Sequence, residues 1–129
     1  MKVISIKSTA REELIDITEQ VAAAVKDTGV EEGLCCVFAP HTTAAVTINE
    51  NADPTVKKDI ITGLKSLALE KNSFLHSEGN SPAHIKSSLV GASELIIIEN
   101  KKLQLGTWQG IFLCEFDGPR NRKVYIKIL

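Results

Sequence analysis

The chain has 129 residues, a formal net charge of −1, 43% hydrophobic residues and 24% charged residues, which is the composition of an ordinary globular protein. A charge this close to zero excludes a general attraction to nucleic acid or to an anionic membrane, and an aromatic content of 5% disfavours platforms on which bases stack. The length suits one domain spanning residues 1–129. We therefore expect a single domain with neither a nucleic acid nor a membrane as its partner.

The first third of the chain predicts a strand, a helix and a second strand. Polar and apolar residues alternate over 2–8, which favours a half-buried strand. Apolar residues recur at steps of three and four over 12–28, which predicts an amphipathic helix with Asp16 as N-cap and Gly29 just beyond its C-terminus. A short apolar run at 34–39, ended by Pro40, predicts the next strand.

The middle of the chain predicts a strand, a long helix and a long loop. AAVTIN at 44–49 is typical of a strand, and Asp53 followed by Pro54 is a typical helix start. Helical spacing then continues to about Glu70. Residues 71–83 show no periodicity, and a loop of that length inside a compact domain tends to be functional or disordered.

The last part predicts a short helix followed by strands. Ser81 and Pro82 can cap a helix over 83–91, and strands are expected at 94–99, 101–105, 108–116 and 123–129. Strands that follow one another directly at both ends indicate an antiparallel or mixed sheet rather than a doubly wound one. The predicted fold class is α+β, with one large, mainly antiparallel sheet packed against two long helices and one short helix.

The cysteines and the apolar runs bear on the compartment. Cys35, Cys36 and Cys114 make an odd set with two adjacent members, which predicts small buried side chains rather than a disulfide framework or a zinc-thiolate site. The opening residues contain no long apolar segment, and the longest purely apolar run, at 95–98, is too short to span a bilayer. We expect a cytoplasmic protein.

All three histidines lie in short polar stretches. His41 lies in PHTTAAVTINEN, and His76 and His84 bracket HSEGNSPAH. Neutral imidazole is the commonest side-chain metal ligand and the usual acid–base group near neutral pH. If the stretches converge, the three rings form one site. The alternative is that each histidine is simply solvated.

Other polar residues in these two stretches suggest what such a site would hold. Thr42 and Thr43 have hydroxyl and backbone N–H groups that can hold a phosphate or a carboxylate, although Thr is also an ordinary strand residue. Glu78 suits a metal ligand, a partner that orients a histidine, or a general base. Asn80 supplies hydrogen-bond donors. The spacing of Glu78 and His84 from His76 matches no standard zinc motif.

A third stretch, LGTWQGIFLCEFDGPR, adds both aromatic and charged candidates. Trp108 could stack on a heterocycle or simply pack in the core, with Gln109 beside it. Asp117 could bind a cation while Arg120 grips phosphate oxygens, with Arg122 adding positive field. The alternative for DGPR is a plain hairpin turn with a solvated arginine.

Taken together and in this order, the three stretches resemble the YjbQ-type family, also called the secondary thiamine-phosphate synthase family. The resemblance runs over essentially the whole chain through HTTAAVTINENADP, H-x-EGN-x-x-AH, SLVG and LGTWQGIFLCEFDGPR. It implies an α+β fold with a large antiparallel sheet, a homotrimer, and a weak activity that joins hydroxymethylpyrimidine pyrophosphate to thiazole phosphate. Its motifs match this chain at His41, His76, Glu78, Asn80, His84, Trp108, Gln109, Asp117 and Arg120.

These observations leave three hypotheses for the function. The first is a transferase of the thiamine-phosphate synthase kind, in which His41, Glu78, His84, Asp117 and Arg120 are catalytic and a small phosphorylated substrate is held by Thr42, Thr43, Asn80, Trp108 and Gln109. The second is a zinc hydrolase, in which His41, His76 and His84 leave a fourth position for water. The third is a trimeric ligand-binding module without catalysis. Under either of the first two, a divalent metal, Zn²⁺ or Mg²⁺, is the expected cofactor.

Overall fold

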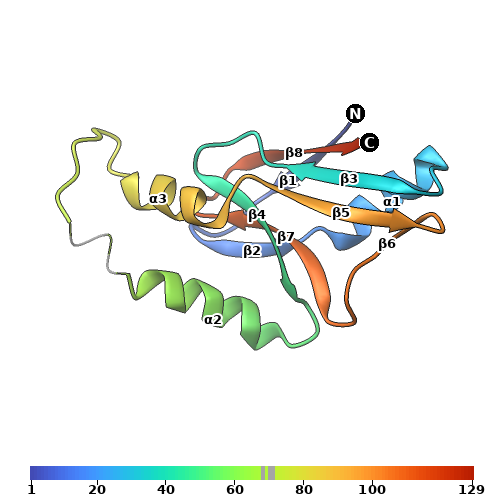
Figure 1. Cartoon of the computed structure of the whole chain (residues 1–129). Coiled ribbons are helices and arrows are strands. Elements are labelled where there is room, and N and C mark those ends of the chain that lie inside the picture. Colours follow the sequence, from blue (N-terminus) through green and yellow to red (C-terminus); the bar gives the residue numbers. More distant parts are fainter. Residues whose placement is uncertain (68, 70–71) are drawn as a thin grey trace.

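The computed structural model describes residues 1–67, 69 and 72–129 (Figure 1). Within that part, eight strands and three helices follow in the order β1 Lys2–Lys7, β2 Glu13–Asp16, α1 Thr18–Thr28, β3 Gly33–Phe38, β4 Ala44–Glu50, α2 Pro54–Lys65, α3 Ser81–Val90, β5 Ser93–Glu99, β6 Lys102–Leu103, β7 Gln109–Glu115 and β8 Asn121–Ile128. The predicted end of the second helix near Glu70 and the start of the following loop at Lys71 lie outside the described residues.

The strands form two sheets in which every pair is antiparallel. One sheet has the order β1-β8-β3-β5-β6, and the other has the order β2-β7-β4. The α+β fold and its antiparallel strands are therefore confirmed, while the single large sheet of the prediction is divided in two. Helices α2 and α3 lie at one end of the molecule, beside the three-stranded sheet, and the two termini lie near each other (Figure 1).

The three-stranded sheet is buried on both faces. Successive residues of β7 belong alternately to two apolar clusters, with Ile111 and Leu113 in one, and Phe112 and Cys114 in the other. The first cluster joins the sheet to α1 and the five-stranded sheet, and the second joins it to α2 and α3. Because both faces are covered, the strand sequence is continuously apolar instead of alternating.

The first predicted helix is wrong at its start. Residues 13–16 form β2, which pairs with β7 so that Leu14 lies opposite Cys114. The spacing of apolar residues suits a helix, but hydrogen bonding to β7 decides the backbone here. Asp16 is not the N-cap, which is Ile17. Its carboxylate instead accepts from the backbone N–H of Thr18 at 2.9 Å and so helps turn the strand into α1. The predicted end of α1 is confirmed, with Gly29 in the left-handed region at φ 69°.

The other two helices also differ from their predicted bounds. Asp53 caps α2 as predicted, accepting from the N–H of Thr55 at 2.9 Å, but the helix ends at Lys65. Helix α3 begins at Ser81 and has 10 residues against 11 in α1, so it is not a distinctly short helix. The loop before it therefore ends at Asn80 instead of Ala83, and His84 lies on the helix.

Two further predictions can be compared with the fold. The predicted strand at 101–105 shrinks to β6, because Asn100 and Lys101 adopt positive φ angles of 52° and 64° in a tight turn. Cys35 and Cys114 are buried as predicted, and burial raises their thiol pKa values to about 11 and about 12. None of the described helices combines the length and the apolar content needed to cross a bilayer.

Candidate functional site

Three connections in the chain end at one pocket. They are the β3–β4 turn, the segment that leads into α3, and the β7–β8 turn. The pocket has a volume of about 430 Å³ and is lined by Pro40, His41, Thr42, Thr43, His76, Glu78, Asn80, His84, Asp117, Arg120 and Arg122. All three histidines and seven of the other nine candidate site residues from the sequence therefore lie around one hollow, which we call the histidine pocket.

The other two predicted residues lie at the opposite end of β7. This strand runs from Gln109 to Glu115, and at about 3.3 Å per residue it separates its ends by roughly 20 Å. The Trp108 side chain is 62% exposed, so it neither packs in the core nor lines the histidine pocket. Gln109 accepts from the backbone N–H of Gly106 at 2.7 Å and stabilises a turn. Within one chain, these two residues are not part of the pocket.

A buried ion pair stands behind the pocket. Glu115 and Arg122 are 0% and 5% exposed, and the Arg122 Nε donates to Glu115 Oε1 at 2.9 Å. Arg122 also donates to the Thr43 hydroxyl at 2.9 Å, and Ser8 donates to Glu115 at 2.6 Å. The backbone N–H of Arg120 in turn donates to the Ser8 hydroxyl at 2.7 Å. One buried pair thus fixes both the β3–β4 and the β7–β8 turns.

The positive charge of Arg122 is paired with the Glu115 carboxylate within this network. Burial raises the pKa of Glu115, but the hydrogen bonds from Arg122 and Ser8 outweigh that effect and hold the pKa below its ordinary value. The carboxylate therefore stays ionised and neutralises Arg122. The positive charge of Arg122 still acts on His41, whose pKa it lowers, but Glu115 opposes that effect, and the hydrogen bonds of Arg122 position the turns. Glu115 was missed because it lies within the apolar run IFLCEF.

Arg120 is held in place by Asp117. Its Nε donates to the Asp117 carbonyl oxygen at 2.7 Å, and its Nη2 donates to Asp117 Oδ2 at 3.0 Å. Asn80 donates to the same carboxylate oxygen at 2.8 Å. Two of the five guanidinium N–H groups are used in this way, and the side chain is 49% exposed. The remaining N–H groups can hold an anion in the pocket.

The same contacts determine the protonation state of Asp117 and the orientation of the Asn80 amide group. Burial raises the pKa of Asp117, but the hydrogen bonds from Asn80 and Arg120 outweigh that effect and hold the pKa below its ordinary value. The carboxylate is therefore ionised. Because Asp117 must accept, the Asn80 amide group presents its Nδ2 to that carboxylate. Its Oδ1 is buried and has no hydrogen-bond partner among the described residues. A ligand with an N–H or O–H group would satisfy this oxygen.

The histidines divide into a pair and a separate ring. His76 and His84 meet edge to face with ring centroids 5.3 Å apart. The Nε2 of His41 lies 2.9 Å from the backbone nitrogen of Lys123 and 3.1 Å from its carbonyl oxygen, so the backbone of this residue holds the ring. Burial and the nearby Arg122 lower the pKa of His41, which keeps this ring neutral near pH 7.

The three imidazoles are not grouped as a set of metal ligands. The Nε2 of His41 contacts the backbone of Lys123. Over residues 1–67, 69 and 72–129, no group of three or more His, Cys, Asp or Glu side chains is placed to hold a metal ion. The histidine pocket instead combines acid–base groups with a fixed guanidinium.

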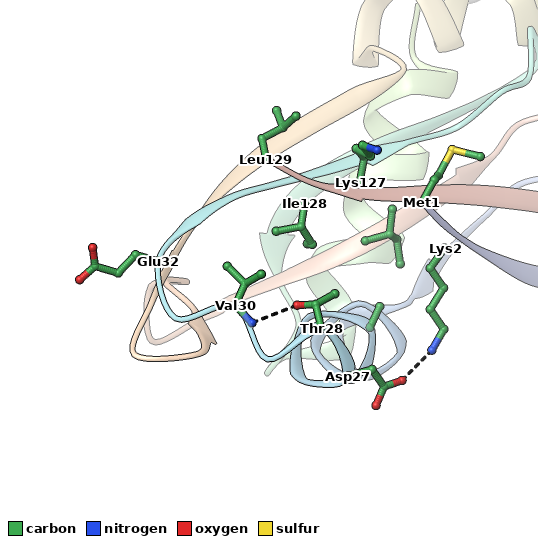
Figure 2. A pocket seen from close by; sticks show the side chains of 11 residues that line it. Met1, Lys2, Asp27, Thr28, Val30, Glu32, Lys127, Ile128 and Leu129 are labelled. Atoms are coloured by element: carbon green, nitrogen blue, oxygen red, sulfur yellow. Dashed lines mark hydrogen bonds and ion pairs between the residues drawn. The ribbon is translucent and has the colours of Figure 1, made fainter.

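A separate hollow lies beside the two termini. It has a volume of about 560 Å³, and its walls come from Met1, Lys2, the end of α1 and the end of β8 (Figure 2). Its clearest polar contact is the exposed ion pair of Lys2 with Asp27 at 2.8 Å. Acid–base and anion-binding groups are concentrated in the histidine pocket, which is therefore the candidate functional site.

The chain is similar to known proteins over almost its whole length. A family model described as UPF0047 protein YjbQ-like matches residues 2–129. A UPF0047 protein of Methanocaldococcus jannaschii is 56% identical over 96% of this chain and 90% of its own length. The UPF0047 protein YugU of Bacillus subtilis is 52% identical over 100% and 98%.

Solved structures give the same result. The crystal structure of a YjbQ/UPF0047 family protein from Clostridium acetobutylicum superposes with a TM-score of 0.97, at 53% identity and over 100% of both chains. A YbjQ-like protein of unknown function from Sulfolobus solfataricus superposes with a TM-score of 0.94 at 35% identity, over 98% of this chain and 94% of the other.

Proposed function

The chain belongs to the UPF0047 YjbQ-like family, and on that premise we propose that it is an enzyme acting on a small phosphorylated substrate in the histidine pocket. The specific reaction we propose is that of a thiamine-phosphate synthase. The ring nitrogen of thiazole phosphate forms a bond to the methylene carbon of hydroxymethylpyrimidine pyrophosphate. The C–O bond to pyrophosphate breaks, and its electron pair leaves with the pyrophosphate.

The observation that carries the proposal is the position of Arg120. Its guanidinium is anchored by Asp117 and stands half exposed in the same pocket as three imidazoles. Departure of pyrophosphate requires a fixed positive charge near the oxygen that receives the electron pair, because preorganised charge lowers the barrier without reorganisation. Asp117 pairs with Arg120, but the Arg120 side chain is 49% exposed and can reach an anion, whereas Arg122 is 5% exposed and its donors are used by Glu115 and Thr43.

The other pocket residues have roles that follow from their chemistry. His76 and His84, in contact with each other, offer a proton donor and a proton acceptor in one place. Glu78 lines the pocket and adds a carboxylate general base. Asn80 presents an unpaired amide oxygen to an amine or hydroxyl of the substrate, and Thr42 lies across the pocket on the β3–β4 turn. No step is assigned to a metal.

The test is a condensation assay with the two precursors, following release of pyrophosphate. We expect His84→Ala to lower kcat by about a hundredfold or more, the usual contribution of a general acid or base, and Glu78→Gln to lower it by a similar order. Asp59→Asn changes an exposed carboxylate on α2 and is the matched control. Thermal unfolding of each variant checks the fold. Equal rates for wild type and His84→Ala would rule out the assigned role.

We also propose that the active form is a homotrimer, as the family resemblance implies. The outer face of the five-stranded sheet supports this, because Leu34, Phe38, Leu95 and Ile97 are each at least 40% exposed there. Leu34 lies opposite Ile97 across the β3–β5 pair, so the side chains are adjacent. Contiguous apolar surface of this kind is typical of an interface between protein chains.

A further inference from the structure

A second hollow adjoins the histidine pocket. It has a volume of about 350 Å³ and is lined by His41, Thr42, Ala44, His84, Ser87, Ser88, Gly91 and Ala92. Three of these residues, His41, Thr42 and His84, also line the histidine pocket. The two hollows therefore share a wall, and the volume of the second is at the lower end of the range for small-molecule sites, about 300–1,000 Å³.

The hydroxyl group of Ser87 points to a ligand in this second hollow. Ser87 is 8% exposed, and its Oγ is buried without a hydrogen-bond partner among the described residues. The neighbouring Ser88 differs, because its hydroxyl donates to the His84 carbonyl oxygen at 2.9 Å. Buried hydroxyl groups are normally paired, because an unpaired one loses its hydrogen bonds to water without forming others. Rotation of the Ser87 side chain toward the hollow would let its hydroxyl pair with a hydrogen-bond acceptor on a bound group.

The chemistry of the lining restricts what that group can be. As far as the structure describes the chain, the lining of the second hollow includes no Lys, Arg, Asp or Glu. Ala44, Gly91 and Ala92 have small side chains or none, and the imidazoles of His41 and His84 also line the hollow. An anion would find no counter-charge beyond the shared histidines, and burial keeps His41 neutral near pH 7. The hollow suits a compact, uncharged ring with an acceptor atom.

We propose that the two hollows form one bipartite site, in which the histidine pocket holds the phosphate-bearing part of the substrate and the second hollow holds its uncharged heterocycle. The assignment of the phosphate half rests on the proposed function. The bond between the two halves then lies at the shared wall, beside His84. Ser87 is a specificity-determining residue that recognises the ring and has no contact with the phosphate groups.

The experiment compares two ligands by calorimetry. Inorganic pyrophosphate reports on the histidine pocket alone, and hydroxymethylpyrimidine pyrophosphate reports on both hollows. In the wild-type protein we expect the ester to bind at least about tenfold more tightly than pyrophosphate, because of ring burial and one added hydrogen bond. Ser87→Ala and Ala92→Leu should each reduce that gain to about threefold or less. Neither should change the affinity for pyrophosphate.

Controls separate this inference from the proposed function. Ser93→Ala removes an exposed hydroxyl at the start of β5 and should keep the full gain. Ser87→Ala removes a hydroxyl without a partner, so its thermal unfolding should match wild type. Failure of pyrophosphate to bind would overturn the proposed function. Normal pyrophosphate binding with no gain for the ester, or with the gain intact in both variants, would overturn the bipartite site alone.

Discussion

The two ends of β7 look alike in sequence and differ in structure. One end carries GTWQG and the other carries DGPR, and both combine glycine with polar or charged residues. At the Glu115 end, the β3–β4 turn, the start of α3 and the β7–β8 turn meet around one pocket. At the Gln109 end, the polar groups are used in a local turn and Trp108 stands in solvent. A site forms where several chain segments end together, and a motif alone does not reveal this.

The largest effect is expected when the Glu115 carboxylate, which supports the turns at the pocket end of β7, loses its charge. Glu115→Gln leaves Arg122 buried at 5% exposure without a counter-charge. Loss of one partner from a buried ion pair costs about 3–5 kcal/mol, so we expect a drop of that order in the free energy of unfolding. Chemical denaturation with fluorescence of the single tryptophan measures it.

The control for this prediction is an ion pair at the surface. Asp27→Asn breaks the ion pair between Asp27 and Lys2. The Lys2 side chain is 50% exposed and the Asp27 side chain is 66% exposed. Exposed pairs contribute little because solvent screens both charges, so the denaturation midpoint should stay nearly unchanged. Equal effects of the two substitutions would show that Glu115 does not support the pocket in the way described.

A second prediction compares ligand binding at the two ends of β7. Arg120→Gln removes the anchored guanidinium, and we expect the affinity for inorganic pyrophosphate to fall about tenfold or more, as for loss of a charge-assisted contact. Gln109→Ala breaks only a bond within its own turn and should change that affinity less than about twofold. Calorimetric titration measures both.

The opposite result would be informative about assembly. A similar loss in Gln109→Ala and Arg120→Gln would mean that the GTWQG turn of one copy reaches the pocket of another. The sequence prediction for Trp108 and Gln109 would then hold between subunits, although it fails within one chain. Light scattering at the concentration of the titration would show whether three copies are associated.

Much of the site could be predicted because polar residues in turns stand out against apolar strands. His41, Glu78, Asn80 and Arg120 were found in this way, and the family resemblance grouped them. Glu115 could not be found, because a charged residue within IFLCEF gives no sign that it is buried and paired with Arg122. Only tertiary contact shows that this carboxylate connects the turns.

The limits of the fold prediction have a similar cause. Helix ends set by a local cap, such as Asp53 and Gly29, were predicted correctly because the signal lies within a few residues. The segment 13–16 was predicted as helix because its apolar spacing fits one, yet it pairs with a strand about a hundred residues away in the chain. Division into two sheets depends on pairings of the same long-range kind.

The smallest expected effect concerns the pH dependence of stability at His41. Burial and the nearby Arg122 lower its pKa in the folded protein, while Glu115 acts in the opposite direction. The unfolded chain, with a histidine pKa of about 6.5, therefore takes up a proton at a higher pH than the folded protein does. Stability falls as the pH drops below that value, because the unfolded chain binds this proton more readily than the folded protein does, in which Nε2 lies 2.9 Å from the backbone N–H of Lys123.

His41→Gln isolates this contribution, since an amide oxygen can accept the same N–H without titrating. Comparing the free energies of unfolding at about pH 7.5 and about pH 5.5, we expect wild type to lose more stability than the variant over this window. His76 and His84 are present in both proteins, so their contributions cancel in the difference. An equal or larger loss in the variant would mean that His41 is protonated in the folded pocket. It would then face the ligand as a cation whose Nε2 donates to the Lys123 carbonyl oxygen, 3.1 Å away.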